Sequence, residues 1–357
     1  MRKLRLLAVS GTYPPDIGGS EISFHIGLKK ICERGHEVVV VTDQRHHRDG
    51  YLDGIRIVGS DQDSIEENLD SLNNEYGFDV ILTQLIFAPK AMLWARSHDL
   101  ASMYFMRGTG IKLDLSGSGP YRPDVVVANS NYTACTIQRR FHRDAPVVYP
   151  FIERTRCIPA QRSPHYITMV NPIDIKGGKV LRHLAETFPE KEFLAVKGWT
   201  GLRSESSGWN TKMWDLLKEA HGDTNVYPPE DIQFADLANV RVLDAVDDIK
   251  EVFTKTKITL FAPFWEETFG RVALESLMCG IPLLWCDAGG VKETGINLGG
   301  LEVLNPHMMD SWVNGLDELD SPEEIDKRGE LALGDAAWYD LDKEVDKIES
   351  LLLPMSR

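Results

Sequence analysis

The chain has 357 residues, of which 43% are hydrophobic and 26% charged, and its formal net charge is −15. This is the composition of an ordinary soluble protein with two or three domains. The negative charge argues against nucleic-acid binding and against docking on anionic membranes, because both surfaces would repel it. Lys29, Lys30 and Arg34 form only a small local basic cluster.

The five cysteines include no C-x2-C pair, which indicates neither a disulfide framework nor a zinc site. No group of side chains has the spacing of metal ligands, so we expect no metal. The apolar run near the N-terminus is short and meets Pro14 and Pro15, and it predicts a first strand rather than a signal peptide. No run is long enough for a transmembrane helix. We therefore expect a cytoplasmic protein without stable membrane insertion.

Apolar strand-like runs alternate with helical stretches through the first half of the chain. Strands are expected at 4–10, 37–42, 55–58, 79–84, 101–108 and 124–128, and helices at about 21–34, 64–76, 89–97 and 131–141, the last capped by Asn129 and Ser130. This alternation is typical of a doubly wound parallel sheet. Gly18 and Gly19 lie between the first strand and the first helix, where glycines let the backbone approach a ligand.

The segment 150–164 lacks periodicity and is interpreted as an interdomain linker. A second α/β unit then begins. Its expected elements are strands at 165–171, 192–199 and 240–243, a helix at about 179–188, a polar loop at 200–212 and a solvated acidic face at 317–326. Lys176 precedes two glycines at a strand-to-helix turn, which is a favourable place for an ammonium group to meet phosphate.

The stretch 258–285 has the pattern of a βαβ unit: a strand at 258–262, a helix that opens after Gly270, a C-cap at Gly280 and a strand at 281–285. Glu267 precedes the helix and Glu275 lies inside it, roughly 7 Å further along the axis. Two carboxylates at this offset can bind two hydroxyl-rich parts of one ligand. Alternatively, neither glutamate binds a ligand: Arg271 and Glu275 form a surface ion pair at i,i+4 spacing, and Glu267 is a solvated loop residue.

The sequence WEETFGRVALESLMCGIP resembles the E-x7-E signature of retaining GT-B glycosyltransferases of family 4, the glycosyltransferase group 1 type. The resemblance implies that Glu267 contacts the donor sugar, that Glu275 contacts the ribose, and that Lys176 neutralises the donor diphosphate. The loop with Gly18 and Gly19 is similar to the family's YPP-x-x-GG loop, which approaches that diphosphate. The implied catalytic residues are Lys176 and Glu267. The implied donor-binding residues are Gly18, Gly19, Lys176, Glu267, Thr268, Phe269, Gly270, Arg271 and Glu275.

The chain departs from the family pattern at two places. The family's arginine upstream of the lysine is replaced by Val170 or Asn171, and Arg203 is the candidate substitute. The family's histidine after the strand at 101–108 is absent, and Arg107 stands there instead. Arg107 is either a contact for an anionic acceptor or phosphate, or a solvated side chain.

The resemblance implies an α/β protein of two Rossmann-like domains with parallel sheets facing across a cleft. The expected domains are 1–155 on the acceptor side, with the C-terminal helix at 335–357, and 156–334 on the donor side. The expected activity is retaining transfer of a sugar from a nucleotide-diphosphate donor, with a UDP-sugar favoured, to an unidentified hydroxyl acceptor. No cofactor is expected, since the nucleotide-sugar is a co-substrate. The alternatives are a GDP-mannose-dependent mannosyltransferase and a non-catalytic nucleotide-sugar-binding protein.

Overall fold

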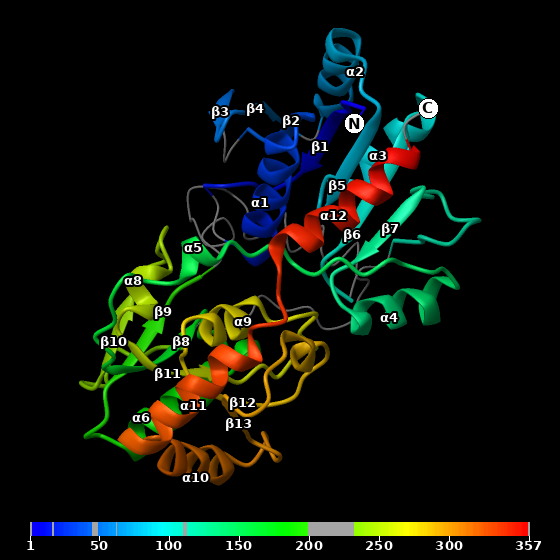
Figure 1. Cartoon of the computed structure of the whole chain (residues 1–357). Helices are drawn as coiled ribbons and strands as arrows, with labels where there is room; N and C mark the ends of the chain where they lie inside the picture. Colours follow the sequence, from blue (N-terminus) through cyan, green and yellow to red (C-terminus); the bar gives the residue numbers. More distant parts are fainter. Residues whose placement is uncertain are drawn as a thin grey trace. The chain divides into compact units, whose positions relative to one another are not determined.

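A computed structural model describes residues 2–15, 18–44, 49–61, 63–109, 113–198 and 232–355. The described chain forms two compact units (Figure 1). Unit 1 contains residues 2–151 and 341–355, and unit 2 contains residues 152–198 and 232–340. The chain therefore passes from unit 1 to unit 2 and returns at its end.

Unit 1 is built on a seven-stranded sheet in the order β3-β4-β2-β1-β5-β6-β7. All neighbouring strands pair in parallel except β3 and β4, which are antiparallel. The strands are β1 (Arg5–Ser10), β2 (Glu37–Asp43), β3 (Gly50–Leu52), β4 (Ile55–Ser60), β5 (Val80–Gln84), β6 (Ala101–Met106) and β7 (Val125–Ala128).

Helices cover both faces of this sheet. They are α1 (Gly19–Glu33), α2 (Ile65–Tyr76), α3 (Ala88–Ser97), α4 (Asn131–Phe141) and α12 (Leu341–Leu352), and the 3-10 turn η5 (Leu353–Met355) follows α12. Successive strand residues point to opposite faces, so Leu6 and Ala8 of β1 pack with α1 and α12. Leu7 and Val9 pack with α2 and α3 on the other face. Burial on both faces explains why the strands are apolar without alternation.

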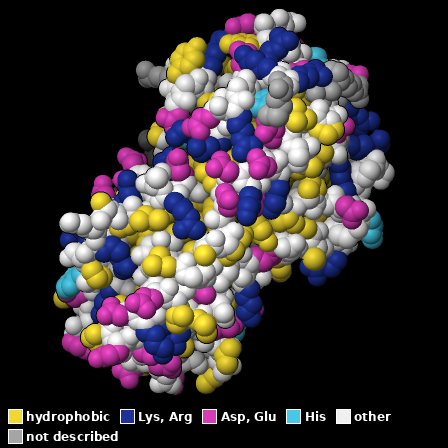
Figure 2. All heavy atoms as spheres, in the orientation of Figure 1, with side chains coloured by type: hydrophobic (Ala, Val, Ile, Leu, Met, Phe, Trp, Pro, Cys, Tyr) yellow, Lys and Arg dark blue, Asp and Glu magenta, His cyan; other side chains and the backbone are white. Residues whose placement is uncertain are grey.

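Unit 2 has a six-stranded parallel sheet in the order β10-β9-β8-β11-β12-β13. Its strands are β8 (Tyr166–Val170), β9 (Phe193–Val196), β10 (Val240–Leu243), β11 (Thr256–Phe261), β12 (Leu283–Trp285) and β13 (Gly300–Glu302). Its helices and 3-10 turns are α5 (Arg154–Cys157), η1 (Asp174–Lys176), α6 (Gly178–Thr187), α8 (Lys250–Phe253), α9 (Arg271–Met278), η4 (Val291–Thr294), α10 (Met309–Leu319) and α11 (Pro322–Asp335). Acidic side chains gather where α10 and α11 lie (Figure 2), and most of those at 317–326 are at least partly exposed, as the sequence predicted. Asp320 is the exception, because its side chain is only 6% exposed and pairs with Lys191 and Lys257.

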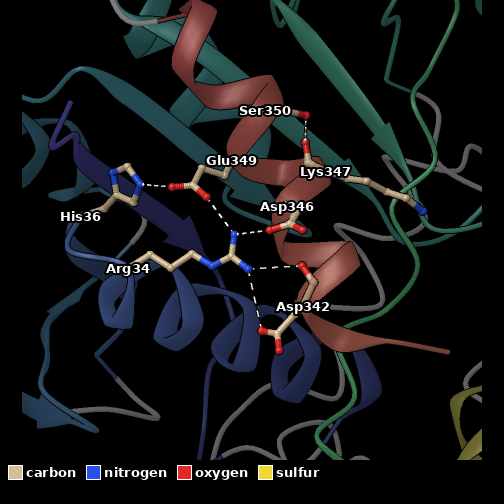
Figure 3. A network of polar contacts seen from close by, with 7 residues as sticks. All are labelled: Arg34, His36, Asp342, Asp346, Lys347, Glu349 and Ser350. Carbon is tan, nitrogen blue, oxygen red and sulfur yellow. Dashed lines mark hydrogen bonds and ion pairs between the residues drawn. The ribbon is translucent and has the colours of Figure 1, made fainter. Parts of the chain in front are cut away.

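Two buried carboxylates of helix α12 form hydrogen bonds with other parts of unit 1. Glu349 accepts hydrogen bonds from His36 Nε2 at 2.9 Å and from Arg34 Nη1 at 2.8 Å (Figure 3). Glu344 accepts one from the backbone N–H of Tyr149 at 2.8 Å. Because Leu4 N donates to His36 Nδ1 at 3.1 Å, the imidazole proton must lie on Nε2, which faces Glu349. Arg34, which directly follows α1, also forms an ion pair with Asp346 of α12.

Most of the predicted elements are confirmed to within a few residues, including the Ser130 cap, whose Oγ accepts from Thr133 N at 3.0 Å. Several elements were not predicted, among them strand β13 and helices α10 and α11. A short helix, α5, lies inside the segment interpreted as a linker. Strand β3 forms a hairpin with β4 through Asp53 and Gly54, both with positive φ. The Asp-Gly pair is a hairpin signal that the sequence carried.

Candidate donor site

Each unit has a point where the strand order reverses. In unit 2 the chain runs outward from β8 through β9 to β10, and then outward on the other side from β11 through β12 to β13. Ligands of such sheets bind beyond the carboxyl ends of the two central strands. Lys176 follows β8, and Glu267 follows β11, so both lie at this reversal point, as the sequence predicted from their strand-to-helix turns.

Lys176, Trp265 and Glu267 are in mutual contact. Lys176 Nζ forms an ion pair with Glu267 Oε2, and Trp265 Nε1 donates to the same oxygen at 3.0 Å. The Lys176 ammonium also lies 4.5 Å from the centroid of the Trp265 ring, in a cation–π contact. We call these three residues the Lys176–Trp265–Glu267 cluster. The charge-bearing residues come from the predicted set, whereas Trp265 was not predicted.

The loops that carry the cluster are fixed to one another. Phe264 N donates to Ile175 O at 2.9 Å, which joins the loops after β11 and β8. Gly290 N donates to Glu267 O at 2.7 Å, which adds the loop after β12. A Cβ on Gly177 would lie 2.2 Å from Ala262 O, so only glycine permits this approach. The site is therefore organised by backbone contacts that do not need a ligand.

A second carboxylate–cation pair lies on α9. Glu275 Oε1 accepts from Arg271 Nη2 at 2.7 Å and from Arg271 Nε at 3.2 Å. The ion pair between Arg271 and Glu275 that we considered as an alternative to ligand binding therefore exists. It is not a solvated surface pair, because the Glu275 side chain is only 10% exposed and that of Arg271 13%. Gly270, with φ of 92°, immediately precedes the helix. Thr268 and the buried Phe269 complete the turn between Glu267 and α9.

The two glutamates share one feature. Each uses a single carboxylate oxygen for its cation: Oε2 in Glu267 and Oε1 in Glu275. Among the described residues, no hydrogen-bond donor contacts the other oxygen, Oε1 of Glu267 or Oε2 of Glu275. A carboxylate held in this way by one oxygen is oriented for a ligand hydroxyl at the other.

Unit 1 has its own reversal point, between β1 and β5, whose end residues Ser10 and Gln84 are register partners. Gln84 accepts from Arg107 Nε at 2.8 Å and donates to Ser10 Oγ at 3.3 Å. Gly18 and Gly19 lie beside this point, where α1 begins. Whether these glycines contact a diphosphate remains a prediction.

Two further residues have structural explanations. Asn171, one of the two positions where the family's arginine was expected, has φ of 58°, a left-handed conformation that asparagine tolerates better than most residues. His25 is buried, with its ring nitrogens 2.7 Å from Tyr13 Oη and 3.0 Å from Asp53 Oδ2, so it is packed in the fold. Burial raises the pKa of the Tyr13 hydroxyl well above its usual range. Arg203 lies outside the described residues.

Comparisons with known proteins agree with this architecture. Residues 227–329, which include Glu267, Arg271 and Glu275, match the family model described as "Glycosyl transferases group 1". A stretch of 127 residues is 28% identical to a D-inositol 3-phosphate glycosyltransferase of Gordonia bronchialis, and it spans 34% of this chain and 26% of that protein.

Solved structures resemble the whole chain. A sucrose-phosphate synthase from Thermosynechococcus elongatus aligns over 98% of both chains with a TM-score of 0.73 and 15% identity. A glycosyltransferase from Rickettsia africae aligns over 99% of both chains with a TM-score of 0.71 and 14% identity. The Anabaena protein HepE, solved with UDP-glucose, covers 98% of this chain and 99% of its own, with a TM-score of 0.71 and 15% identity. The fold is therefore that of GT-B glycosyltransferases, with two Rossmann-like units.

Proposed function

We propose that this protein is a glycosyltransferase of the group 1, family 4 type that transfers a sugar from a nucleotide-diphosphate donor to a hydroxyl acceptor with retention of configuration. The observation that carries the proposal is the pair of glutamates, Glu267 and Glu275. Each is held by a cation through one oxygen, and among the described residues no hydrogen-bond donor contacts the other oxygen. Both lie in the part of the chain that matches group 1 glycosyl transferases.

In the proposed complex, Glu267 Oε1 accepts a hydrogen bond from a hydroxyl of the donor sugar, and Glu275 Oε2 accepts one from the ribose. Lys176 and the backbone N–H groups around Gly270 bind the diphosphate. These groups stabilise the negative charge that grows on the leaving group as the bond to the sugar breaks. The same charge complement supports a mechanism without a metal ion, in which protein groups do the neutralising.

The chemical step is attack by the acceptor oxygen on the anomeric carbon, on the face that the diphosphate leaves. The bond from that carbon to the acceptor oxygen forms as the bond to the phosphate oxygen breaks. The acceptor proton passes to the departing phosphate oxygen, so no protein base is needed on the opposite face. We assign the acceptor to unit 1, near Gln84 and Arg107, and a UDP-sugar to unit 2, because HepE was solved with UDP-glucose.

The experiment is a panel of UDP-, GDP- and ADP-sugars incubated with the purified protein, with and without excess EDTA, and assayed for released nucleotide. We expect slow donor hydrolysis by one nucleotide class, and we expect the rate to survive EDTA. Binding without any hydrolysis or transfer would favour the non-catalytic alternative. Loss of the rate with EDTA, restored by magnesium or manganese, would overturn the metal-independent mechanism.

A further inference from the structure

We infer that Trp265 is a positioning residue of the donor site. Its indole N–H positions Glu267, which contacts the sugar, and its ring positions Lys176, which contacts the diphosphate. This inference rests on the proposed function, because it assigns Glu267 to the sugar and Lys176 to the diphosphate. It adds a residue that neither the E-x7-E spacing nor the lysine turn predicts. The argument depends on contacts within the loops after β8 and β11 of unit 2.

Trp265 makes two different contacts with the two charged groups. Its Nε1–H donates to Glu267 Oε2 at 3.0 Å, and its ring centroid lies 4.5 Å from Lys176 Nζ. Trp265 is 38% exposed as a whole residue, whereas the side chains of Lys176 and Glu267 are only 17% and 14% exposed. Tryptophan is usually well buried, so a tryptophan this exposed contributes less to the core than the other large aromatic residues do.

The N–H contact sets the direction of the oxygen that remains. Lys176 and Trp265 both bind Oε2, so the carboxylate plane of Glu267 is fixed, and with it the position of Oε1. A diphosphate would compete with Glu267 for the Lys176 ammonium, since both are anionic oxygen ligands. When Lys176 turns to phosphate, the indole N–H is the contact that keeps Glu267 in place for the sugar.

The contact with the Trp265 ring positions the Lys176 ammonium. A cation over an indole face is attracted by the ring, and the attraction is strongest for tryptophan among the aromatic side chains. It therefore holds the Lys176 ammonium near the site whether its anionic partner is Glu267 or phosphate. The two contacts can be separated, because phenylalanine keeps a ring face but has no N–H, and leucine has neither.

The test measures the affinities of UDP and UDP-glucose by calorimetry, or of GDP and GDP-mannose if the donor panel selects guanosine. In Trp265→Phe, the nucleoside diphosphate should bind within about twofold of wild type, while the nucleotide-sugar loses about tenfold. In Trp265→Leu, both ligands should lose affinity. Adding Trp265→Phe to Glu267→Gln should cause no further loss for the nucleotide-sugar, because the N–H acts through that carboxylate.

Trp338→Phe is the matched control. Trp338 is also in unit 2 and also 38% exposed, and its Nε1 also donates at 3.0 Å, but to the backbone oxygen of Thr294. This variant should bind both ligands as wild type does. Equal loss of both ligands in Trp265→Phe, or no loss, would overturn the role of Trp265 while the proposed function stands. A wild-type protein that binds neither ligand class would overturn both.

Discussion

Lys176 and Glu267 neutralise each other before any ligand arrives, and Arg271 and Glu275 do the same. Ion pairs of partly buried groups contribute little net stability, because desolvation offsets their attraction. Their value here is orientation. Each glutamate is held through one oxygen, Oε2 of Glu267 and Oε1 of Glu275, and in the proposed function the other oxygen accepts a hydrogen bond from a ligand hydroxyl.

Replacing Glu275 by alanine tests its assignment to the ribose. We expect Glu275→Ala to weaken binding of the bare nucleoside diphosphate by about 2 kcal/mol, as for a hydrogen bond to a charged group. The control is Glu324→Ala, which breaks another i,i+4 pair of unit 2, that with Arg328, and should leave the affinity unchanged. Unchanged calorimetric affinity in a folded Glu275→Ala protein would remove Glu275 from the site.

Lys176→Met tests the phosphate contact. If the ammonium stabilises charge that appears in the transition state, the variant should lose about a hundredfold or more in kcat. Lys191→Met is matched to it, because Lys191 is also 17% exposed, pairs with Asp320 at 2.8 Å and lies 5.0 Å from the Phe188 ring centroid. The control should change the melting temperature but not the rate. A Lys176→Met protein with normal kcat would make the lysine a structural residue.

At the scale of elements, α12 shows how a terminal helix is fixed by specific polar contacts. Its apolar residues Val345, Ile348 and Leu352 join the core formed by β1 and α1. Among the described residues of α12, only Glu349 forms hydrogen bonds with both His36 and Arg34, and these bonds fix the position of the helix along unit 1 (Figure 3). Burial by itself raises the pKa of Glu349, but the hydrogen bonds from His36 and Arg34 outweigh it and leave the pKa below its usual value.

The depressed pKa of Glu349 gives a pH dependence with a definite sign. The charged form is favoured in the folded state, so its contribution to stability is present above pH 4.5 and is lost as the pH falls through the lower, folded pKa. Glu349→Gln should lower the stability of unit 1 by about 1–3 kcal/mol at pH 7. The difference should shrink below pH 4, as thermal melting followed across that range will show.

Asp342→Asn is the control for this measurement. Asp342 is 78% exposed and lies 3.8 Å from Arg34, so its charge should matter little. A stability difference between wild type and Glu349→Gln that is the same at pH 7 and below pH 4 would contradict the assignment. A loss of stability in Asp342→Asn as large as that in Glu349→Gln would also contradict it.

The sequence predicted the regular elements better than the contacts between loops. The stretch 258–285 was predictable because strand, glycine and helix signals agree there, and the structure confirms its strand–helix–strand order. Trp265 was not, because its role depends on Lys176, far away in the chain. Arg162 was missed for the same reason: its guanidinium donates to the Cys279, Gly280 and Thr256 oxygens. In that setting, burial lowers the pKa of Arg162.

At the scale of the whole molecule, both units repeat one design, in which a parallel sheet reverses its strand order and polar side chains gather at the carboxyl ends of its central strands. In unit 2 these side chains form two ion pairs, Lys176 with Glu267 and Arg271 with Glu275. In unit 1 they include Gln84 and Arg107, which are joined by a hydrogen bond. No helix among the residues that the structure describes is long and apolar enough to cross a membrane. The proposed reaction uses one reversal point for the donor and the other for the acceptor.

The stereochemistry of transfer tests the central claim most directly. Glu267 and Glu275 are assigned to the donor, and His25 is packed between Tyr13 and Asp53, so none of these groups serves as a base for attack from the far face. An α-linked nucleotide-sugar should therefore give an α-linked product, which the anomeric coupling in the proton NMR spectrum of the product reports. A β-linked product from an α-linked donor would contradict the retaining mechanism and the roles of both glutamates.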